Sequence, residues 1–468
     1  MWRIMGDAET MGQQEFDVES ILDVLLKPTP DRISEIARIA HPGDVAMAFE
    51  RLDETERENV LVGLPSEVLT AWVDYLPAAD VERRLNTLSI KEQREVLDAL
   101  SDDDLVDFLQ EIEEEERPQY IELLGAEKRL ISEDLMRYPE RTAGGRMTVA
   151  MATIRENLTV KDALQALKAI RDEAELLSRI YVLDENRRIL GKVRLRDLAF
   201  STWDTPIRDL MDTDQSSINV HADQEEAAQM IARYDLMALP VVDDGGRLLG
   251  VITHDDALQI LEEESTEDME RSSGIGGQGD LAYLQTQPFT HFKRRSGWIL
   301  ALAFMALSSG FVIHSFQDVF TAHYILALYL PMVVAAGGNT GAQSATMVVR
   351  AMSLGEVGTR EFWRVISKEA QVGLMLGTLL GVCVSLQINF LLPSAFVEGN
   401  GGEFKIGLIV GLSLMAQVLT STFIGAALPI AAKKANLDPA VVASPAITTL
   451  VDMSGSIIYF TLAGWVFS

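Results

Sequence analysis

Cysteine is nearly absent from this sequence, which has a single one, Cys383, in 468 residues. One thiol excludes an intramolecular disulfide framework and a zinc site built from several cysteines. The six histidines show no His-Glu-x-x-His spacing and no Gly-x-x-x-x-Gly-Lys loop occurs, which argues against a zinc protease and an ATP-driven pump. Basic residues are also scarce, with 40 Lys and Arg against 70 Asp and Glu. The net charge of −30 argues against duplex nucleic acid as a partner.

The negative charge is confined to one part of the chain. From Phe292 to Ser468 there are ten Lys or Arg and eight Asp or Glu, a net charge of +2, so residues 1–291 carry the remaining −32. The C-terminal segment is apolar as well. The sequence therefore predicts an acidic soluble part joined to a membrane part.

The C-terminal segment contains five apolar stretches long enough to cross a bilayer, which takes about 20 residues. They are Ser296–Phe316, Ala322–Val349, Ala370–Leu392, Ile406–Ile430 and Ala446–Phe467. Nine of its ten basic residues fall on one side of these spans, which places the N-terminus in the cytoplasm and the C-terminus outside. Met1–Thr10 has no apolar run like that of a signal peptide. A bacterial inner (plasma) membrane is the expected location.

One acidic residue stands out within the spans. Asp452 lies about two turns into the fifth span, where a charge is costly and usually faces water or a protein interior. Neighbouring Thr448, Thr449 and Ser454 add hydroxyl oxygens. A carboxylate with neutral oxygens is a ligand set for a hard cation. The alternative is an Asp paired with a buried basic residue, although no Lys or Arg lies deep in any span.

The second span is unusual because it contains Pro331 and a run of small residues from Gly337 to Ser344. Such residues predict one of two structures. Either the helix is broken and its free carbonyls line water together with Asn339 and Gln343, or neighbouring helices pack closely against the small residues. The sequence leaves both open.

The soluble part begins with a 12-residue period between residues 17 and 135. An apolar residue precedes a helix-starting residue at Leu52-Asp53, Leu64-Pro65, Leu76-Pro77, Leu88-Ser89 and Leu100-Ser101. This period predicts a superhelical stack of short helices. The last repeat is rich in acid, and Asp103 and Asp107 would share one helix face. A solvated acidic surface is the plain interpretation of that face.

A second repeat, of 59 residues, follows Gly145. The segment from Val182 to Leu198 recurs from about Val242 to Ala257, each copy with a strand, an Asp turn, a Gly-containing strand and a helix. This pattern resembles a tandem pair of CBS domains, which bind adenine nucleotides or ions and are rarely catalytic. An acidic helix over about Asp255–Arg271 and a Gly/Ser stretch then lead to the first span.

The order of these parts resembles the MgtE family of magnesium channels and transporters, from about Asp17 to Trp465. The most specific motifs are Gly337–Ser344 and the stretch from Leu437 to Gly455. The resemblance implies a multi-domain fold with an α-helical superhelical N-domain, an α+β tandem CBS pair and an all-α transmembrane domain of five helices. The expected divisions are 1–16 (extension), 17–138 (N-domain), 139–200 and 201–262 (CBS), 263–291 (connecting helix and linker) and 292–468 (membrane).

The resemblance also implies a homodimer that takes up Mg²⁺ through a pore on its two-fold axis. The residues that match the family's pore are Asp452, Ser444, Thr448, Gly337, Gly338, Asn339, Thr340 and Gly341. Those that match its cytosolic Mg²⁺ sensor are Asp103, Asp107, Asp223, Glu225, Asp235, Asp256, Glu264 and Glu267. ATP is a candidate ligand of the CBS pair. The family often has Asn and Ala at the positions of Ser444 and Thr448, and an acid at that of Gln259.

In the mechanism that we expect, the sensor carboxylates repel one another at low Mg²⁺ and the soluble domains separate. At high Mg²⁺ the bound ions bridge the carboxylates, and the connecting helices hold the pore shut. A transporter of Mn²⁺ or Co²⁺ is the alternative, because hard oxygen ligands do not separate these ions from Mg²⁺. A CBS-regulated membrane enzyme and a sensor without a pore are less favoured.

Overall fold

The structure of the protein is a computed structural model that describes residues 17–170, 176–213, 216–276, 283–284, 286–391, 403–439 and 444–467. The predicted extension, residues 1–16, lies outside these ranges. The chain divides into two compact units, and along helix α15 the boundary falls between Glu264 and Ser265. We describe each unit by itself.

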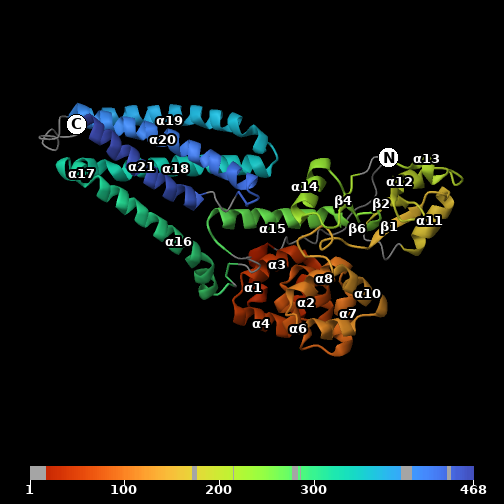
Figure 1. Cartoon of the computed structure of the whole chain (residues 1–468). Coiled ribbons are helices and arrows are strands. Elements are labelled where there is room, and N and C mark those ends of the chain that lie inside the picture. Colours follow the sequence, from red (N-terminus) through yellow and green to blue (C-terminus); the bar gives the residue numbers. More distant parts are fainter. Residues whose placement is uncertain are drawn as a thin grey trace, which may run out of the picture. The chain divides into compact units, whose positions relative to one another are not determined.

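The N-domain consists of ten short helices and one turn of 3₁₀-helix (Figure 1). The helices are α1 (Val18–Leu25), α2 (Pro30–Ile39), α3 (Pro42–Glu50), α4 (Glu54–Gly63), α5 (Ser66–Trp72), α6 (Ala78–Leu85), α7 (Ile90–Ala99), α8 (Asp102–Glu111), α9 (Arg117–Leu123) and α10 (Ala126–Leu135). One apolar core joins α1 to α9, from Ile21 in α1 to Leu124 after α9. The predicted stack of short helices is confirmed.

The 12-residue period of the sequence arises because a new helix begins every 12 residues from α4 to α8. Asp53, Pro65, Pro77, Ser89 and Ser101 are the N-caps of α4 to α8. Asp53 and Ser89 each form a capping box, with Glu56 and Glu92, which satisfies backbone donors at the helix start. The apolar residue before each cap packs in the domain core: Leu52, Leu64, Leu76 and Leu100 are buried, and Leu88 is half-buried. Each repeat therefore supplies one core residue and one helix start.

The CBS pair contains two three-stranded sheets. In the first sheet β2 (Leu176–Leu183) lies between β1 (Met151–Arg155), to which it is parallel, and β3 (Ile189–Arg194), to which it is antiparallel. The second sheet repeats this arrangement with β4 (Ile218–Asn219), β5 (Ala238–Val242) and β6 (Leu248–Thr253). The predicted repeat is confirmed to the level of its turns. Asp184 Oδ1 accepts the backbone N–H groups of Asn186 and Arg188, and Asp243 Oδ1 accepts those of Gly245 and Arg247 in the same way.

Five helices accompany the strands of the pair. They are α11 (Val160–Ala169), α12 (Leu195–Ala199), α13 (Ile207–Leu210), α14 (Gln224–Tyr234) and the long α15 (His254–Ser272). A shared core connects this part to the N-domain, because Val106 of α8 and Leu135 of α10 pack with Ile231 of α14 and Ile260 of α15. The acidic face of α8 is thereby held near α15.

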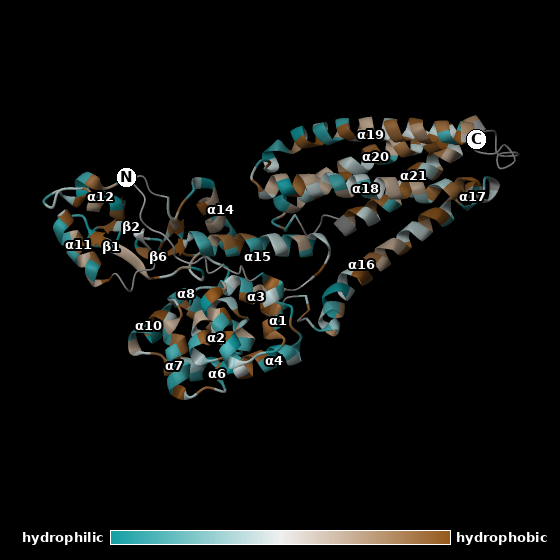
Figure 2. Ribbon diagram, turned by 180° about the vertical axis from the view of Figure 1, so that it is seen from behind, coloured by the Kyte–Doolittle hydropathy of each residue, from teal (hydrophilic) through white to brown (hydrophobic). Residues whose placement is uncertain are grey.

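The second unit is a helical bundle. It contains α16 (Pro288–Ser315), α17 (Gln317–Ala322), α18 (Leu326–Ser353), α19 (Phe362–Leu391), α20 (Glu403–Lys434) and α21 (Ser444–Phe467). Helices α18 to α21 run side by side, whereas α16 runs at an angle to them (Figure 1). Hydrophobic residues cover most of α16 and α19, whose N-terminal ends are hydrophilic (Figure 2). Helix α20 packs against α18, α19 and α21.

Four helices in the described residues are long and apolar enough to cross a membrane. They are Pro288–Ser315, Thr359–Phe390, Phe404–Lys434 and Ala446–Phe467. The bundle has the five long helices that we predicted, but α18, the second, is not among these four. Its middle carries Asn339, Thr340, Gln343 and Ser344, which lower its hydropathy.

Of the two structures that the sequence left open for the second span, the broken helix is wrong, because α18 is continuous from Leu326 to Ser353. Pro331 lies inside α18, in its second turn, and supplies no N–H to the helix, yet the helix continues past it. The small residues serve close packing instead. A Cβ on Gly337 would lie 2.3 Å from Gln417 Nε2, and a Cβ on Gly425 of α20 would lie 2.3 Å from the carbonyl oxygen of Gly341. The carbonyls of this stretch stay inside a regular helix.

Candidate ion pathway and sensor

Asp452 is the centre of the candidate pathway. It lies in α21 and is half-buried. Its carboxylate forms no ion pair or hydrogen bond with any residue that the structure describes. A Cβ on Gly338 of α18 would lie 3.9 Å from Asp452 Oδ1 and 3.4 Å from Thr448 Cγ2. The structure therefore places Gly338, Thr448 and Asp452 together, and the alternative of an Asp with a basic partner finds no support in the described chain.

The other predicted pathway residues take different places. Gly337 and Gly341 face α20 and α21 in tight packing. Asn339 is exposed, and Thr340 is buried with its hydroxyl donating to the carbonyl oxygens of Ala336 and Gly337 at 2.9 and 3.1 Å. Ser444 begins α21, but its side chain is outside what is described. Only Gly338 and Thr448 are seen beside Asp452.

Sequence reasoning missed Gln417 of α20, which is fully buried and donates from Nε2 to the carbonyl oxygen of Val451 at 2.8 Å. Val451 immediately precedes Asp452. An amide inside an apolar span is the same kind of signal that singled out Asp452, so Gln417 was open to detection from the sequence.

The predicted sensor residues of α8 meet an unpredicted cation. The guanidinium of Arg146 donates to Asp107 Oδ2 at 3.0 Å, to Glu263 Oε2 of α15 at 2.6 Å and to Gln224 Oε1 of α14 at 2.9 Å. Gln224 Nε2 in turn donates to Glu264 Oε1 at 2.6 Å. Arg146, Gln224 and Glu263 were missed, and nothing in the sequence distinguishes Arg146 from the other basic residues of the acidic half.

Asp103 and Asp256 lie close enough for their charges to interact. Asp103 is 8% exposed and accepts a hydrogen bond from the Ser101 hydroxyl at 2.8 Å. Asp256 accepts the backbone N–H of Thr253 at 3.2 Å. Burial raises the pKa of Asp256 to about 6, and the charge of Asp103 adds to this shift. Burial also raises the pKa of Asp107 to about 7, although Arg146 opposes the shift. Burial is the main cause in both cases, and the neighbouring carboxylates add to it.

The remaining sensor candidates are not gathered with these. Asp223 caps α14 and accepts the N–H of Glu225 at 2.8 Å, and Glu225 accepts from Gln229 at 2.8 Å. Asp223 and Glu225 are the sequence neighbours of Gln224, which accepts a hydrogen bond from Arg146. Glu267 pairs with Arg271. No group of three or more His, Cys, Asp or Glu side chains arranged to hold a metal occurs in the described parts of the chain.

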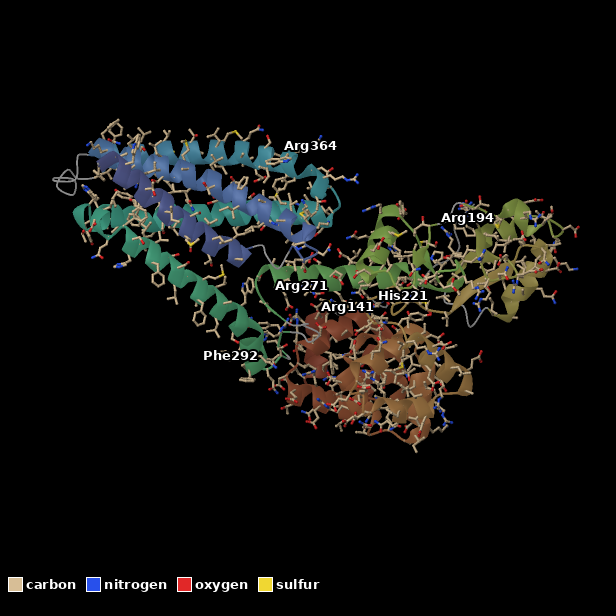
Figure 3. All side chains as sticks on the ribbon, viewed as in Figure 1. Arg141, Arg194, His221, Arg271, Phe292 and Arg364 are labelled. Carbon is tan, nitrogen blue, oxygen red and sulfur yellow. The ribbon has the colours of Figure 1, made fainter. Side chains whose placement is uncertain are left out.

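Asp235 lies elsewhere, in a cavity of the CBS pair of about 300 Å³. It ends α14 in the left-handed conformation, with φ of 53°. Both CBS copies line the cavity. Its charged wall residues are Arg179, Lys192, Arg194, Asp197, Asp212 and Asp235. Arg194 pairs with Asp197 at 2.7 Å (Arg194 is labelled in Figure 3).

In the second unit, two ion pairs connect the C-terminal end of α15 to other segments of that unit. Arg271 (Figure 3) contacts Asp438, in the loop after α20, at 2.7 Å. Glu270 pairs with Arg294 of α16, and the N–H of Gly276 donates to the carbonyl oxygen of Arg294 at 3.1 Å. The end of the acidic helix is thus attached to the loop that leads to α21.

Family models match three parts of this chain. Residues 40–141 match the MgtE intracellular N domain, residues 143–201 and 207–263 match the CBS domain, and residues 330–462 match the MgtE divalent cation transporter. The fold and the site thus define a multi-pass membrane transporter of divalent cations with an intracellular N domain and a CBS pair.

Relatives extend the match to nearly the whole chain. It is 34% identical over 448 residues to the magnesium transporter MgtE of Thermus thermophilus. The aligned residues make up 95% of this chain and 97% of the relative. It is 30% identical over 448 residues to that of Bacillus subtilis, with the same coverage. The chain belongs to the MgtE family, so it is a transporter and not an enzyme.

Among solved structures, the cytosolic domain of the Mg²⁺ channel MgtE in complex with ATP is 34% identical to this chain. It covers 52% of this chain and 99% of its own, with a TM-score of 0.47.

Proposed function

We propose that this chain carries Mg²⁺ into the cell past the carboxylate of Asp452 and that cytosolic Mg²⁺ closes the path. The observation that carries the proposal is the Asp452 carboxylate, which has no partner in the described chain and faces Gly338 and Thr448. Mg²⁺ gives up its water reluctantly, so a carboxylate beside a glycine, with room for waters, suits a hydrated ion.

A homodimer completes this path. One chain offers a single carboxylate here, and two copies related by a two-fold axis bring two Asp452 side chains to the same ion. Gly337, Asn339, Thr340, Gly341 and Ser444 belong to the same stretch of the path in this proposal. Residues 292–468 form the membrane part, in a bacterial inner membrane with the C-terminus outside.

Transport through Asp452 is tested by uptake in a Mg²⁺-auxotrophic bacterium and by flux into proteoliposomes. Asp452→Ala and Asp452→Asn should abolish rescue and weaken Mg²⁺ binding, while Asp318→Ala, which removes an exposed carboxylate of α17, should behave as the parent. Normal Mg²⁺ flux and selectivity in a well-inserted Asp452→Ala protein would refute the path. Rescue by the parent with Mn²⁺ or Co²⁺ but not Mg²⁺ would favour the alternative ion.

Gating rests on the acidic residues between the N-domain (residues 17–138), the CBS copies (139–200 and 201–262) and the connecting segment (263–291). Asp103 is buried, Asp107 and Asp256 are half-buried, and all three have raised pKa values, so a divalent cation beside them would relieve their repulsion. We assign Asp223, Glu225, Glu264 and Glu267 to further sites along the same faces. Bound Mg²⁺ then favours the compact state and shuts the path.

The sensor is tested by neutralising Asp103, Asp223 and Glu264 together, as Asn, Asn and Gln. Uptake should then stay active at Mg²⁺ concentrations that close the parent. Unchanged shut-off in a protein that folds normally would disprove the sensor while leaving the pathway intact.

The cavity of the CBS pair favours ATP as a second ligand. Three cations, Arg179, Lys192 and Arg194, line a space of about 300 Å³ between the two copies, which suits phosphate groups. Asp235, a sensor candidate by resemblance, borders this cavity and not the Asp103 cluster. Titration of the full-length protein with ATP, with Lys192→Ala and Arg179→Ala as variants, tests this site.

A further inference from the structure

The side-chain amide of Gln417 lies where three helices, α18, α20 and α21, pack together. It lies on α20 with no exposed surface, and Nε2 donates to the carbonyl oxygen of Val451 on α21 at 2.8 Å. The same oxygen accepts the hydroxyl of Ser454 at 3.0 Å. Two side-chain donors therefore converge on the peptide group that joins Val451 to Asp452.

Glycines on both neighbouring helices make room for this amide. A Cβ on Gly337 of α18 would lie 2.3 Å from Gln417 Nε2, and one on Gly455 of α21 would lie 2.7 Å from the same atom. Any larger residue at either position would displace the amide. The packing of α18, α20 and α21 is thus built around the Gln417 side chain.

Stability alone does not explain why an amide is here. Gln417 Oε1 is buried and has no hydrogen-bond partner among the described residues. An unpaired buried acceptor destabilises a fold, and an apolar side chain of the same size would avoid that cost. An apolar residue could not donate the hydrogen bond that Gln417 Nε2 gives to the carbonyl oxygen of Val451.

We infer that Gln417 is a positioning residue for the ion pathway: it fixes the rotation and depth of the α21 turn that carries Asp452, so that the carboxylate faces Gly338. Successive residues of a helix are about 100° apart, so a donor that holds the Val451 carbonyl also sets the direction of the Asp452 side chain. The inference rests on the proposed passage of Mg²⁺ past Asp452. Gln417 does not touch the ion in this arrangement.

The test compares Gln417→Met with the parent as full-length protein in proteoliposomes. Methionine is close to glutamine in size and shape but has no N–H donor. We expect the half-saturating Mg²⁺ concentration to rise about tenfold, as for residues that orient a metal-binding carboxylate, with a smaller change in maximal flux. Ser413→Ala is the matched control, since Ser413 is a fully buried polar residue one turn earlier on α20 whose hydroxyl has no described partner. It should leave the half-saturating concentration unchanged.

A double-mutant cycle separates positioning from a general effect on packing. In the Asp452→Asn background, where transport is lost, Gln417→Met should produce no further rise in the Mg²⁺ concentration that half-saturates binding to the purified full-length protein. An unchanged value in Gln417→Met alone, or the same rise in both backgrounds, would overturn the inference. If Asp452→Asn itself leaves binding and flux unchanged, the proposed pathway fails instead.

Gly455→Ala provides a second variant if Gln417→Met does not insert. Its methyl group would press on Gln417 Nε2 from α21, so a rise in half-saturating Mg²⁺ supports the inference and an unchanged value in a folded protein opposes it.

Discussion

The guanidinium of Arg146, at the start of the CBS pair, lies 3.0 Å from Asp107 Oδ2 of the N-domain. The same group contacts Glu263 of α15 at 2.6 Å, and its side chain is 14% exposed. A fixed cation thus occupies part of the acidic junction where the proposed sensor binds Mg²⁺. It joins the N-domain to α15 without a metal ion.

Removing this cation should loosen the junction. Arg146→Ala leaves the half-buried Asp107 without its ion-pair partner and removes a contact of the more exposed Glu263, and we expect a loss of about 2 kcal/mol of docking free energy. Closure of the path should then need several times more Mg²⁺, measured as the concentration that halves uptake into proteoliposomes. Arg129→Ala, which breaks a surface pair with Glu133, is the control. If Arg146→Ala and the parent need the same Mg²⁺ concentration to halve uptake, the contact plays no part in gating.

Glu82 of α6 should make N-domain stability depend on pH. Burial, and then the carboxylates of Glu116 and Glu113, raise its pKa to about 7. Because the folded state holds this proton more tightly than the unfolded state, the contribution is fully present below the ordinary pKa of 4.5 and is lost as pH rises through about 7. Glu82→Gln should therefore raise the unfolding temperature at pH 8 and have little effect at pH 4.

The matched substitution Glu95→Gln alters an exposed carboxylate on α7 and should shift neither curve. Equal unfolding temperatures of Glu82→Gln and the parent at pH 8 would show that the ionised Glu82, near Glu113 and Glu116, does not destabilise the N-domain.

The pair between Arg271 and Asp438 should transmit the position of α15 to the pathway, since Asp438 precedes α21 in the chain. Arg271→Glu places two acids together, so closure by Mg²⁺ should weaken. The exchanged pair, Arg271→Glu with Asp438→Arg, should restore it in part. Uptake against Mg²⁺ concentration gives the readout, and failure of the exchange to improve on the single variant would count against this link.

Two neighbouring glycines of α18 should respond differently to alanine. Gly337→Ala collides with Gln417 and should lower stability by about 1–3 kcal/mol, as overpacking does. Gly338→Ala places its methyl group in ordinary contact, 3.4 Å from Thr448 and 3.9 Å from Asp452 Oδ1, so the protein should fold but carry less Mg²⁺. Thermal unfolding and flux measured on both variants separate the effects. Parental flux in Gly338→Ala would place the ion path elsewhere.

The sequence by itself determined the local structure of the soluble part. Asp53, Ser89 and Ser101 start helices because each accepts the backbone N–H three residues ahead. Asp184 and Asp243 make identical turns for the same reason. These interactions span a few residues, so their pattern is visible in the chain. Asp452 was also visible, because a carboxylate in an apolar span is costly wherever it points.

The tertiary structure alone decided how distant residues meet. Whether Pro331 and the glycines break α18 depended on what packs against them, and Gln417 of another helix fills that space. Arg146 lies 39 residues from Asp107 and 117 from Glu263, a separation that no local pattern bridges. Asp235, at the left-handed end of α14, borders the CBS cavity and not the Asp103 cluster. Such contacts depend on how whole elements pack, and packing is set by all of their surfaces at once.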